Sequence, residues 1–428
     1  MHRFGATAGY GEAAPAPRTH PGAERATVNA NGPFRSAFRL ESGSRVSDDR
    51  GRVHPEFPAP MPVASVYTLM DEARRRAGRA FDAAGLGPVQ SPSRVVAEMP
   101  GVRLRAYESP EASAAGGPVL LIVPATLKRA YVWDLLPDVS VVRRCLDRGL
   151  RVYMLEWLDP APAEDGFGLA DYAERLPLAA LDAIAAETGE SDAVLAGHSL
   201  GGVFATILAA LHPERVRGLV LVDSPLAFGP DRGGPLARAV AAAPHARVLR
   251  GLGGSPVPGS FVSLLATAAA PDALALQPMA DFGASLGDPL AAAVHARVQR
   301  WMLDEFALPG RLFEDVLEGL YREDRLCAGT LDVGGRRVGL DLLRCPVLAV
   351  VNPPGGVVPP ASVLDGLDAL PADLPRRTVY YEGDRGPALQ HLGPLVSPSA
   401  HARLWPEILD WIVMPRHTPD GDKVSHRG

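Results

Sequence analysis

The stretch DAVLAGHSLGG, from Asp192 to Gly202, decides the fold that we expect for this chain. It opens with a short apolar run typical of a buried strand, and a helical pattern begins near its end. Between the two, residues 197–201 match G-x-S-x-G, in which small residues permit a sharp strand-to-helix turn with the serine at its tip. The N-terminus of the following helix favours negative charge developing at that serine. We therefore predict a nucleophile elbow with Ser199 as nucleophile, the alternative being a plain glycine-rich turn.

Apolar runs on either side of the elbow alternate with helical patterns. The runs expected to be strands are 94–99, 102–107, 119–123, 151–155, 192–196, 219–222, 347–351 and 378–381. The helical patterns lie around 139–147, 172–188, 201–211 and 402–412. Strands that alternate with helices form parallel sheets from right-handed β-α-β units. We therefore predict an α/β fold whose mostly parallel sheet carries helices on both faces.

A long insertion interrupts this alternation just before the penultimate strand. It runs over residues 224–343, about 120 residues, which is too long for a connecting loop. We expect it to fold as a cap over the carboxyl edge of the sheet. Its first half is expected to be loose, and its second half helical around 290–306 and 312–321.

The rest of the chain divides around this cap. The core is expected in two parts, residues 61–223 with the elbow and residues 344–414 with the last strands. Residues 1–60 and 415–428 offer little apolar surface and are expected to be a disordered and a flexible tail, respectively. Met61, where the first periodic segment begins, is a candidate start of translation. In the helical pattern that follows, at 66–84, we expect an arginine run on a solvated face: Arg74, Arg75, Arg76 and Arg79.

Composition excludes several classes of protein. The chain has 428 residues, with 43 Lys+Arg against 49 Asp+Glu and a net charge of −6, so nothing favours nucleic-acid binding. Only Lys128 and Lys423 are lysines, which we interpret as a GC-rich coding bias. The three cysteines are too few for a disulfide framework and form no metal-binding pair. No apolar run is long enough for a transmembrane helix and no signal peptide is evident, so we expect a cytoplasmic protein without metal or cofactor.

A nucleophilic serine needs a general base, and His391 is the histidine best placed to serve. Of the 11 histidines, it alone lies in a loop after the last expected strand and before the last helix. The chain order of serine before histidine is that of serine hydrolases built on this sheet. We therefore predict that His391 activates Ser199.

The developing oxyanion needs two backbone donors. One is expected from Leu200, the residue after the nucleophile. The other must come from the loop that follows the strand 119–123, where Pro124 has no N–H. We take Thr126 as this second donor, with Ala125 as the alternative.

From about residue 63 to residue 412 the chain resembles the α/β-hydrolase superfamily and, within it, the polyhydroxyalkanoate synthases. The stretches that carry the resemblance are PVLLIVPATLKRAYVWDLLPDVSVVRRCLDRGLRVYMLEW (118–157), LAALDAI (178–184), VQRWMLDEFALPGRLFEDVLEGLYREDRL (298–326) and HLGPLVSPSAHARLWPEILDWI (391–412). The third of these, which lies in the expected cap, is the most specific. The resemblance implies hydroxyacyl-CoA or hydroxyalkanoate oligomers as substrates.

Two departures from that family bear on the reaction. The synthases carry a cysteine nucleophile where this chain has Ser199, and an aspartate in a D-x-x-x-P loop where it has Gly355. A serine ester has a poorer leaving group than a cysteine thioester, so the change favours transfer of the acyl group to water. We therefore expect a serine hydrolase that cleaves acyl esters or thioesters through an acyl-Ser199 intermediate.

Two alternative functions stay open, a synthase-like acyltransferase and a non-catalytic binding protein with a degenerate hydrolase site. The expected partner is a small or oligomeric acyl substrate. A homo-oligomer and association with polyester granules are also left open.

The acid that orients His391 must come from another position. Asp223 is our first choice because it ends the strand 219–222, directly beyond the elbow unit, and preserves the order serine, acid, histidine. Glu382 and Asp384, just before the His391 loop, are alternatives. Asn352 could orient the imidazole without charge, and a site with no acid is the remaining case.

Overall fold

The apolar runs form one eight-stranded sheet in the computed structural model, which describes residues 62–108, 117–383 and 391–414. The strands are β1 (Ser93–Met99), β2 (Val102–Tyr107), β3 (Val119–Val123), β4 (Arg151–Trp157), β5 (Ala193–His198), β6 (Val216–Val222), β9 (Val347–Val351) and β10 (Arg376–Tyr380). Their order across the sheet is β1-β2-β4-β3-β5-β6-β9-β10. Only β1 with β2 and β2 with β4 pair antiparallel. The predicted α/β fold with a mostly parallel sheet is confirmed.

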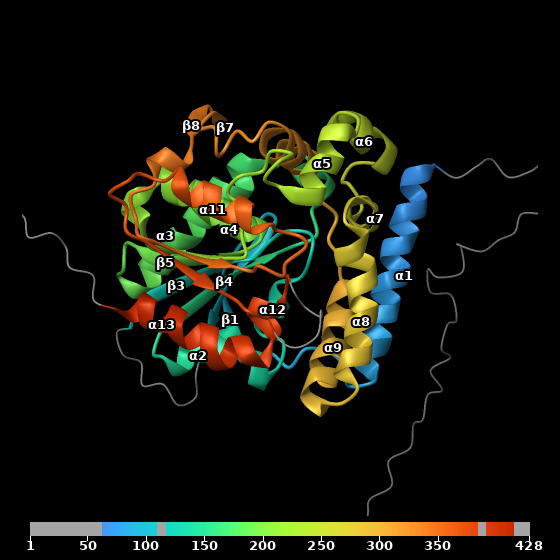
Figure 1. Cartoon of the computed structure of the whole chain (residues 1–428), viewed down its shortest axis with the longest axis horizontal. Helices are drawn as coiled ribbons and strands as arrows, with labels where there is room; N and C mark the ends of the chain where they lie inside the picture. The colour runs from blue at the N-terminus through green and yellow to red at the C-terminus, as the bar shows by residue number, and fades with distance from the viewer. Residues whose placement is uncertain (1–61, 109–116, 384–390, 415–428) are drawn as a thin grey trace, which may run out of the picture. The chain divides into compact units, whose positions relative to one another are not determined.

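Helices cover both faces of this sheet (Figure 1). One face carries α3 (Leu176–Thr188), α4 (Leu200–Leu211) and α11 (Pro360–Asp368), and the other carries α2 (Val141–Asp147), α12 (Gly393–Val396) and α13 (Trp405–Val413). Strand β3 shows why two layers are needed. Leu121 packs into one core and Leu120 and Ile122 into the other, because successive side chains of a strand point to opposite faces. All five residues of β3 are buried as a result.

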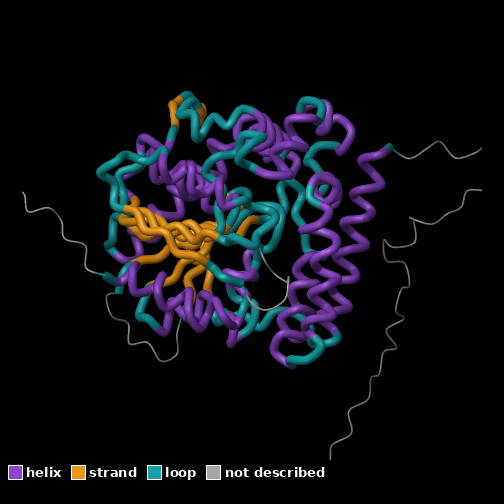
Figure 2. Tube along the Cα trace, in the orientation of Figure 1, coloured by secondary structure: helices purple, strands orange, loops and turns teal. Residues whose placement is uncertain are grey.

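The predicted cap is present between β6 and β9. Its helices are α5 (Gly234–Ala242), α6 (Ala246–Gly253), α7 (Gly259–Ala269), α8 (Gln277–Ser285), α9 (Pro289–Met302) and α10 (Gly310–Glu314). Three further elements are the π-helical turns at Asp272–Leu276 and Asp315–Arg322 and the hairpin of β7 (Leu331–Val333) with β8 (Arg336–Val338). Figure 2 shows that this part of the chain is largely helical.

The first half of the cap is therefore not loose, and that expectation was wrong. Alanine dominates these segments and is the strongest helix former. Pro235 and Pro278 occupy the first turns of α5 and α8, where a missing N–H costs nothing. These prolines begin helices instead of interrupting them.

The first helix, α1 (Val63–Ala83), packs against the cap helices α6, α7 and α9, although the sequence assigned residues 61–223 to the core. In Figure 1 it runs beside α7, α8 and α9. The buried carboxylate of Asp71 accepts hydrogen bonds from the backbone N–H groups of Gly259 (3.1 Å) and Ser260 (2.8 Å) and thereby caps α7. The predictions for 1–60, 415–428 and Met61 lie outside the described residues.

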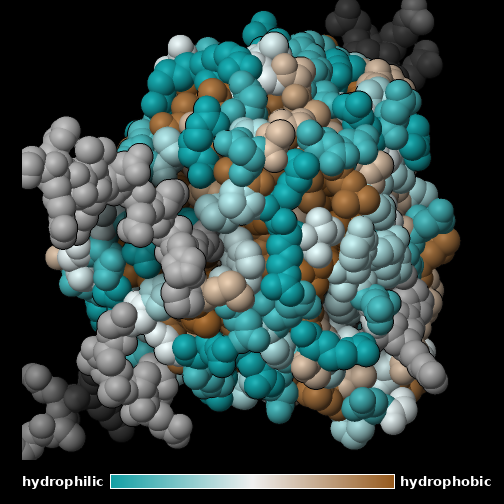
Figure 3. Space-filling view, turned by 60° about the vertical axis from the view of Figure 1, so that its left-hand side comes forward, coloured by the Kyte–Doolittle hydropathy of each residue, from teal (hydrophilic) through white to brown (hydrophobic). Residues whose placement is uncertain are grey.

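On the face shown in Figure 3, hydrophilic side chains predominate and apolar ones form separate patches between them. No single helix in the described ranges is long and apolar enough to cross a bilayer. The segments Gly259–Ala269 and Asp272–Ser285 reach that length only as a pair bent by 115°.

Candidate active site

The elbow places Ser199 between β5 and α4 in a backbone conformation that serine seldom adopts. Its φ is 55° and its ψ is −131°. The flanking glycines permit this turn, because a Cβ on Gly197 would lie 2.4 Å from the backbone nitrogen of Gly202, and one on Gly201 would lie 2.1 Å from the carbonyl oxygen of Val123. Such strained residues persist where the surrounding structure holds them and are concentrated at active sites. The local sequence therefore builds the sharp turn that a nucleophilic serine requires, with Ser199 half-buried at its tip.

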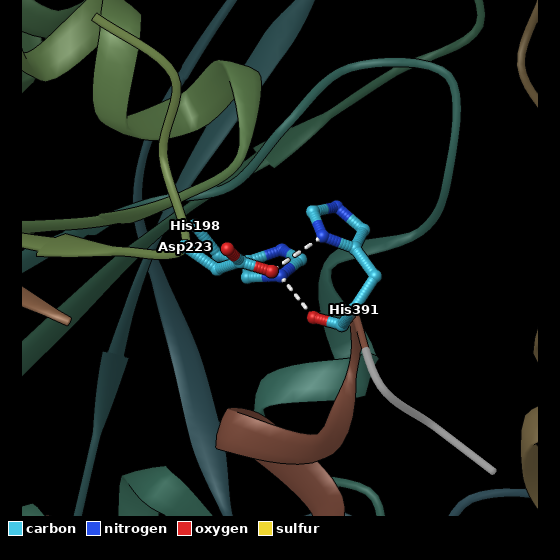
Figure 4. Close-up of side chains that lie close together, drawn as sticks. All are labelled: His198, Asp223 and His391. Atoms are coloured by element: carbon cyan, nitrogen blue, oxygen red, sulfur yellow. Dashed lines mark hydrogen bonds and ion pairs between the residues drawn. The ribbon is translucent and has the colours of Figure 1, made fainter. Parts of the chain in front are cut away.

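The structure brings His391 and Asp223 together. Asp223 follows the end of β6 and is fully buried, and its Oδ2 lies 2.8 Å from the Nδ1 of His391 (Figure 4). A carboxylate accepts this hydrogen bond, so Nδ1 carries the proton and the lone pair of the neutral imidazole is at Nε2. Burial raises the pKa of Asp223, and the bonds from His391 and Asn352 oppose that rise. Because so little water surrounds this carboxylate, its electrostatic attraction to His391 becomes strong when the histidine is charged.

The other candidate acids do not take this place. Asn352 lies at the end of β9, and its amide donates to the Oδ2 of Asp223 at 3.2 Å, so it supports the carboxylate rather than the imidazole. Glu382 is exposed, and Asp384 lies outside the described residues. Gly355 lies close to the same network, since a Cβ there would be 3.0 Å from the amide nitrogen of Asn352. Asn352 thus occupies the space next to the position from which the synthase family supplies its acid.

Sequence reasoning missed His198, the residue before the nucleophile. Its Nε2 lies 2.8 Å from the backbone carbonyl oxygen of His391, and the two rings lie 4.4 Å apart (Figure 4). A carbonyl can only accept, so Nε2 of His198 is the donor. Burial, and to a lesser extent the neighbouring His391, lower the pKa of His198 well below its ordinary value. A neutral His198 therefore anchors the backbone of His391, and only the tertiary structure reveals this contact.

His198, Asp223 and His391 also bring three potential ligand atoms within 4.8 Å of one another. A metal needs lone pairs that converge on one point. Here the Nε2 of His198 is a hydrogen-bond donor to a carbonyl, and the Nδ1 of His391 donates to the carboxylate. The Nε2 of His198 and the Nδ1 of His391 are therefore already engaged as hydrogen-bond donors, and the arrangement fits a histidine-acid pair better than a metal site.

A cavity of about 500 Å³ joins this group to the cap. Ser199, His198 and His391 line it from the core, and α7, α8 and α9 line it from the cap. Thr126 and Ala125, the two candidates for the second oxyanion donor, also line it. Leu200 begins α4 directly after Ser199, so its N–H is one of the helix donors without an intrahelical partner. An acyl group in this cavity would meet the serine, the histidine and the candidate donors together.

Comparison with known proteins extends beyond the elbow. A family model described as the alpha/beta hydrolase fold matches residues 118–253. The Poly(3-hydroxyalkanoate) polymerase subunit PhaC of Haloferax mediterranei is 29% identical over 385 residues, covering 84% of this chain and 72% of that protein. The subunit of the same name from Allochromatium vinosum is 28% identical over 326 residues, covering 75% of this chain and 88% of that protein.

Among solved structures, a thermophilic esterase from Thermogutta terrifontis is similar, with 18% identity and a TM-score of 0.43, over 76% of this chain and 100% of that one. The sheet order, the elbow and the matched family model together show the α/β-hydrolase fold. The chain is an enzyme with the α/β-hydrolase fold, of the hydrolase or acyltransferase type, and is similar in sequence to poly(3-hydroxyalkanoate) polymerases.

Proposed function

We propose that this chain is an acyltransferase of the polyhydroxyalkanoate synthase type, which passes hydroxyacyl groups through an ester on Ser199. The observation that carries the proposal is the similarity to polymerase subunits across 84% of the chain, far beyond the matched hydrolase-fold segment. It favours acyl transfer over the simple hydrolysis that the serine suggested. The pairing of His391 with Asp223 beside Ser199 supports a working site instead of a degenerate one.

The first half of the reaction forms the acyl-enzyme. Nε2 of His391 takes the hydroxyl proton as Oγ of Ser199 attacks the carbonyl carbon of a hydroxyacyl thioester. Asp223 stabilises the imidazolium that results, as in other serine-histidine-acid sites. The N–H groups of Leu200 and Thr126 are the proposed donors to the oxyanion. The C–S bond then breaks, and the departing thiolate recovers the proton from Nε2.

The second half uses the same groups in reverse. The hydroxyl of a second hydroxyacyl group loses its proton to Nε2 and attacks the acyl-Ser199 carbonyl. The bond to Oγ breaks, Ser199 recovers the proton, and the product is an ester one unit longer. Water in place of the hydroxyl would release a free hydroxy acid instead.

Hydrolysis is the second candidate, and the oxygen nucleophile favours it. Thiolates are good nucleophiles and good leaving groups, which suits repeated passage of a growing chain. The Oγ of Ser199 is a poorer leaving group than a thiolate, so the acyl-enzyme persists longer and has more time to react with water. The balance between the two acceptors depends on how well the cap keeps water from the cavity.

A fluorophosphonate probe tests whether the serine is active. We expect the full-length protein to be labelled at Ser199 at neutral pH and the Ser199→Ala variant to remain unlabelled. An unlabelled parent would reject both enzymatic mechanisms and favour a binding protein.

A product assay then separates transfer from hydrolysis. The full-length protein, without the probe, is supplied with 3-hydroxybutyryl-CoA, and the acyl product is analysed by mass spectrometry. Oligomeric or polymeric ester supports the acyltransferase. Release of 3-hydroxybutyrate alone, at every substrate concentration, would leave hydrolysis as the function.

A further inference from the structure

The loop after β3, residues 124–129, is held from two sides. At its start, the indole Nε1 of Trp157 donates to the carbonyl oxygen of Pro124 at 2.8 Å, which ties it to the core. At its end, the backbone N–H of Phe306 in the cap donates to the carbonyl oxygen of Leu127 at 2.8 Å. Lys128 and Glu305 form an antiparallel bridge at the same place. The conformation of this loop, which carries the proposed second oxyanion donor, therefore depends on contacts with the cap as well as with the core.

Lys128 strengthens this junction through its side chain. Its Nζ donates to the backbone carbonyl oxygen of Met302 at 2.7 Å and to Oε1 of Glu305 at 2.5 Å. The side chains of Glu305 and Lys128 are only 2% and 13% exposed, respectively. Arg74 of α1 donates to the same two acceptors, so it points inward and not to the solvated face expected from sequence. Glu305 therefore joins the β3 loop, the cap and α1.

A second set of contacts lies one residue further along. The guanidinium of Arg129 lies 3.9 Å from the ring centre of Phe306 and donates to Asp304 at 3.2 Å. The indole Nε1 of Trp301 donates to the carbonyl oxygen of Arg129 at 2.7 Å. The cap segment 301–306 thus binds both the backbone and the side chains of the loop.

The backbone of Leu127 shows what this junction holds in place. Its φ is 81°, in the left-handed region that a leucine rarely occupies. Such a conformation persists only when the surrounding contacts impose it. The bond from Phe306 and the bridge at Lys128 are the contacts on the cap side. If they are lost, Leu127 can relax to an ordinary backbone conformation, and the adjoining backbone of Thr126 is no longer held from the cap side.

We propose that Lys128 is a positioning residue for the oxyanion hole, because its bonds to the cap fix the loop that presents the N–H of Thr126. The proposal rests on the proposed function for the role of Thr126, whereas the coupling of loop and cap can be measured independently. It also accounts for a lysine in a chain in which 41 of the 43 basic residues are arginine. A compact ammonium fits between a carbonyl and a carboxylate where a planar guanidinium would need more room.

The kinetic test uses Lys128→Met in the full-length protein, with Arg148→Met as a matched control that removes a cation from an exposed ion pair with Asp410. Turnover of 3-hydroxybutyryl-CoA is measured together with inhibition by a trifluoromethyl ketone, which forms a tetrahedral adduct with an active serine. We expect kcat and the affinity for the ketone to fall together by about 10–100-fold, with KM within about twofold, because a displaced oxyanion donor acts on the transition state. The control should match the parent.

Two further results decide how the loss is interpreted. Lys128→Arg keeps the charge and a donor, so it should recover part of the lost kcat. A rise in KM with unchanged kcat, or kcat and ketone affinity within twofold of the parent, would overturn the proposal.

Hydrogen exchange tests the coupling without any substrate. Lys128→Met should raise amide exchange in residues 124–129 and 301–306 together and leave the strand β9 unchanged. Unchanged exchange in either segment would overturn the coupling. Raised exchange in both, in a protein whose serine the fluorophosphonate does not label, would retain the coupling and remove the proposed function.

Discussion

Asp223 and Glu305 are two buried carboxylates, and each binds a basic residue that lines the same cavity. Asp223 is fully buried beside His391, and Glu305 is 2% exposed beside Lys128. The partner of Asp223 is an imidazole, which can take up and release a proton during a reaction. Burial lowers the pKa of Lys128 to about 8, against the opposing effect of Glu305, so this partner is still mostly charged at pH 7.

The two carboxylates, Asp223 and Glu305, are almost equally buried but have different roles. The pair at His391 joins the end of β6 to the segment before α12 and is suited to a transient charge. The pair at Lys128 joins the loop after β3 to the cap and balances a standing charge. We therefore expect the loss of Asp223 to affect catalysis and the loss of Glu305 to affect stability.

The first prediction concerns Asp223→Asn. The neutral amide lacks the negative charge that stabilises an imidazolium, so kcat should fall by on the order of 10²–10⁴. KM and the unfolding transition should change little, because the shape of the side chain is kept. Steady-state kinetics and urea denaturation measure both. Glu382→Gln is the control and should be mild; a retained kcat in Asp223→Asn would exclude this acid.

The second prediction concerns Glu305→Leu. Removing this carboxylate leaves the charges of Lys128 and Arg74 without the anion that they share in a buried place, which costs about 3–5 kcal/mol of unfolding free energy. Equilibrium urea denaturation measures the loss. Glu98→Leu removes an exposed pair with Arg103 and should cost about 0–1 kcal/mol. Equal losses in the two variants would contradict the contrast between buried and exposed pairs.

The third prediction tests the anchor of the His391 backbone. His198→Phe keeps a ring but loses the donor to the carbonyl of His391, so we expect kcat to fall by roughly tenfold, the size of one net hydrogen bond of about 1–1.5 kcal/mol. His198→Gln can still donate and should retain more activity.

The same pair of variants yields a pH test. Because the pKa of His198 lies well below its ordinary value, this residue is already neutral at neutral pH. The acid limb of kcat/KM near neutral pH should therefore be the same in the parent and in His198→Gln. A displaced limb would show that His198 itself titrates in that range.

The smallest expected effect is a partial rescue. In the Asp223→Asn background, Gly355→Asp restores an acid at the position that the synthase family uses. A Cβ there lies 3.0–3.2 Å from the side chain of Asn352, which must move slightly. We expect kcat to recover by a few-fold to about tenfold, well below the parent, since a small misplacement of a catalytic group can cost 10²-fold. No recovery would mean that an acid at residue 355 does not reach His391.

The elbow could be predicted because its determinants are local. Gly197, Ser199 and Gly201 lie within five residues, and the close contacts of their backbone explain the residue types. The meeting of Asp223 with His391 followed from topology, because the carboxyl ends of neighbouring parallel strands meet at one edge. The helices in the first half of the cap were missed because proline and glycine were taken as breaks where they occupy helix starts.

By itself, the sequence determined the α/β architecture, the place of the cap and the elbow with Ser199, since these depend on short-range periodicity and on turn geometry. Only the tertiary structure decided that His198 holds the backbone of His391, that Asn352 supports Asp223, and that Lys128 and Arg74 share Glu305. These contacts join segments separated by 129 to 231 residues. A histidine, lysine or arginine has the same local pattern whether it faces solvent or a buried carboxylate, and only the packing of distant elements removes the water and supplies the partner.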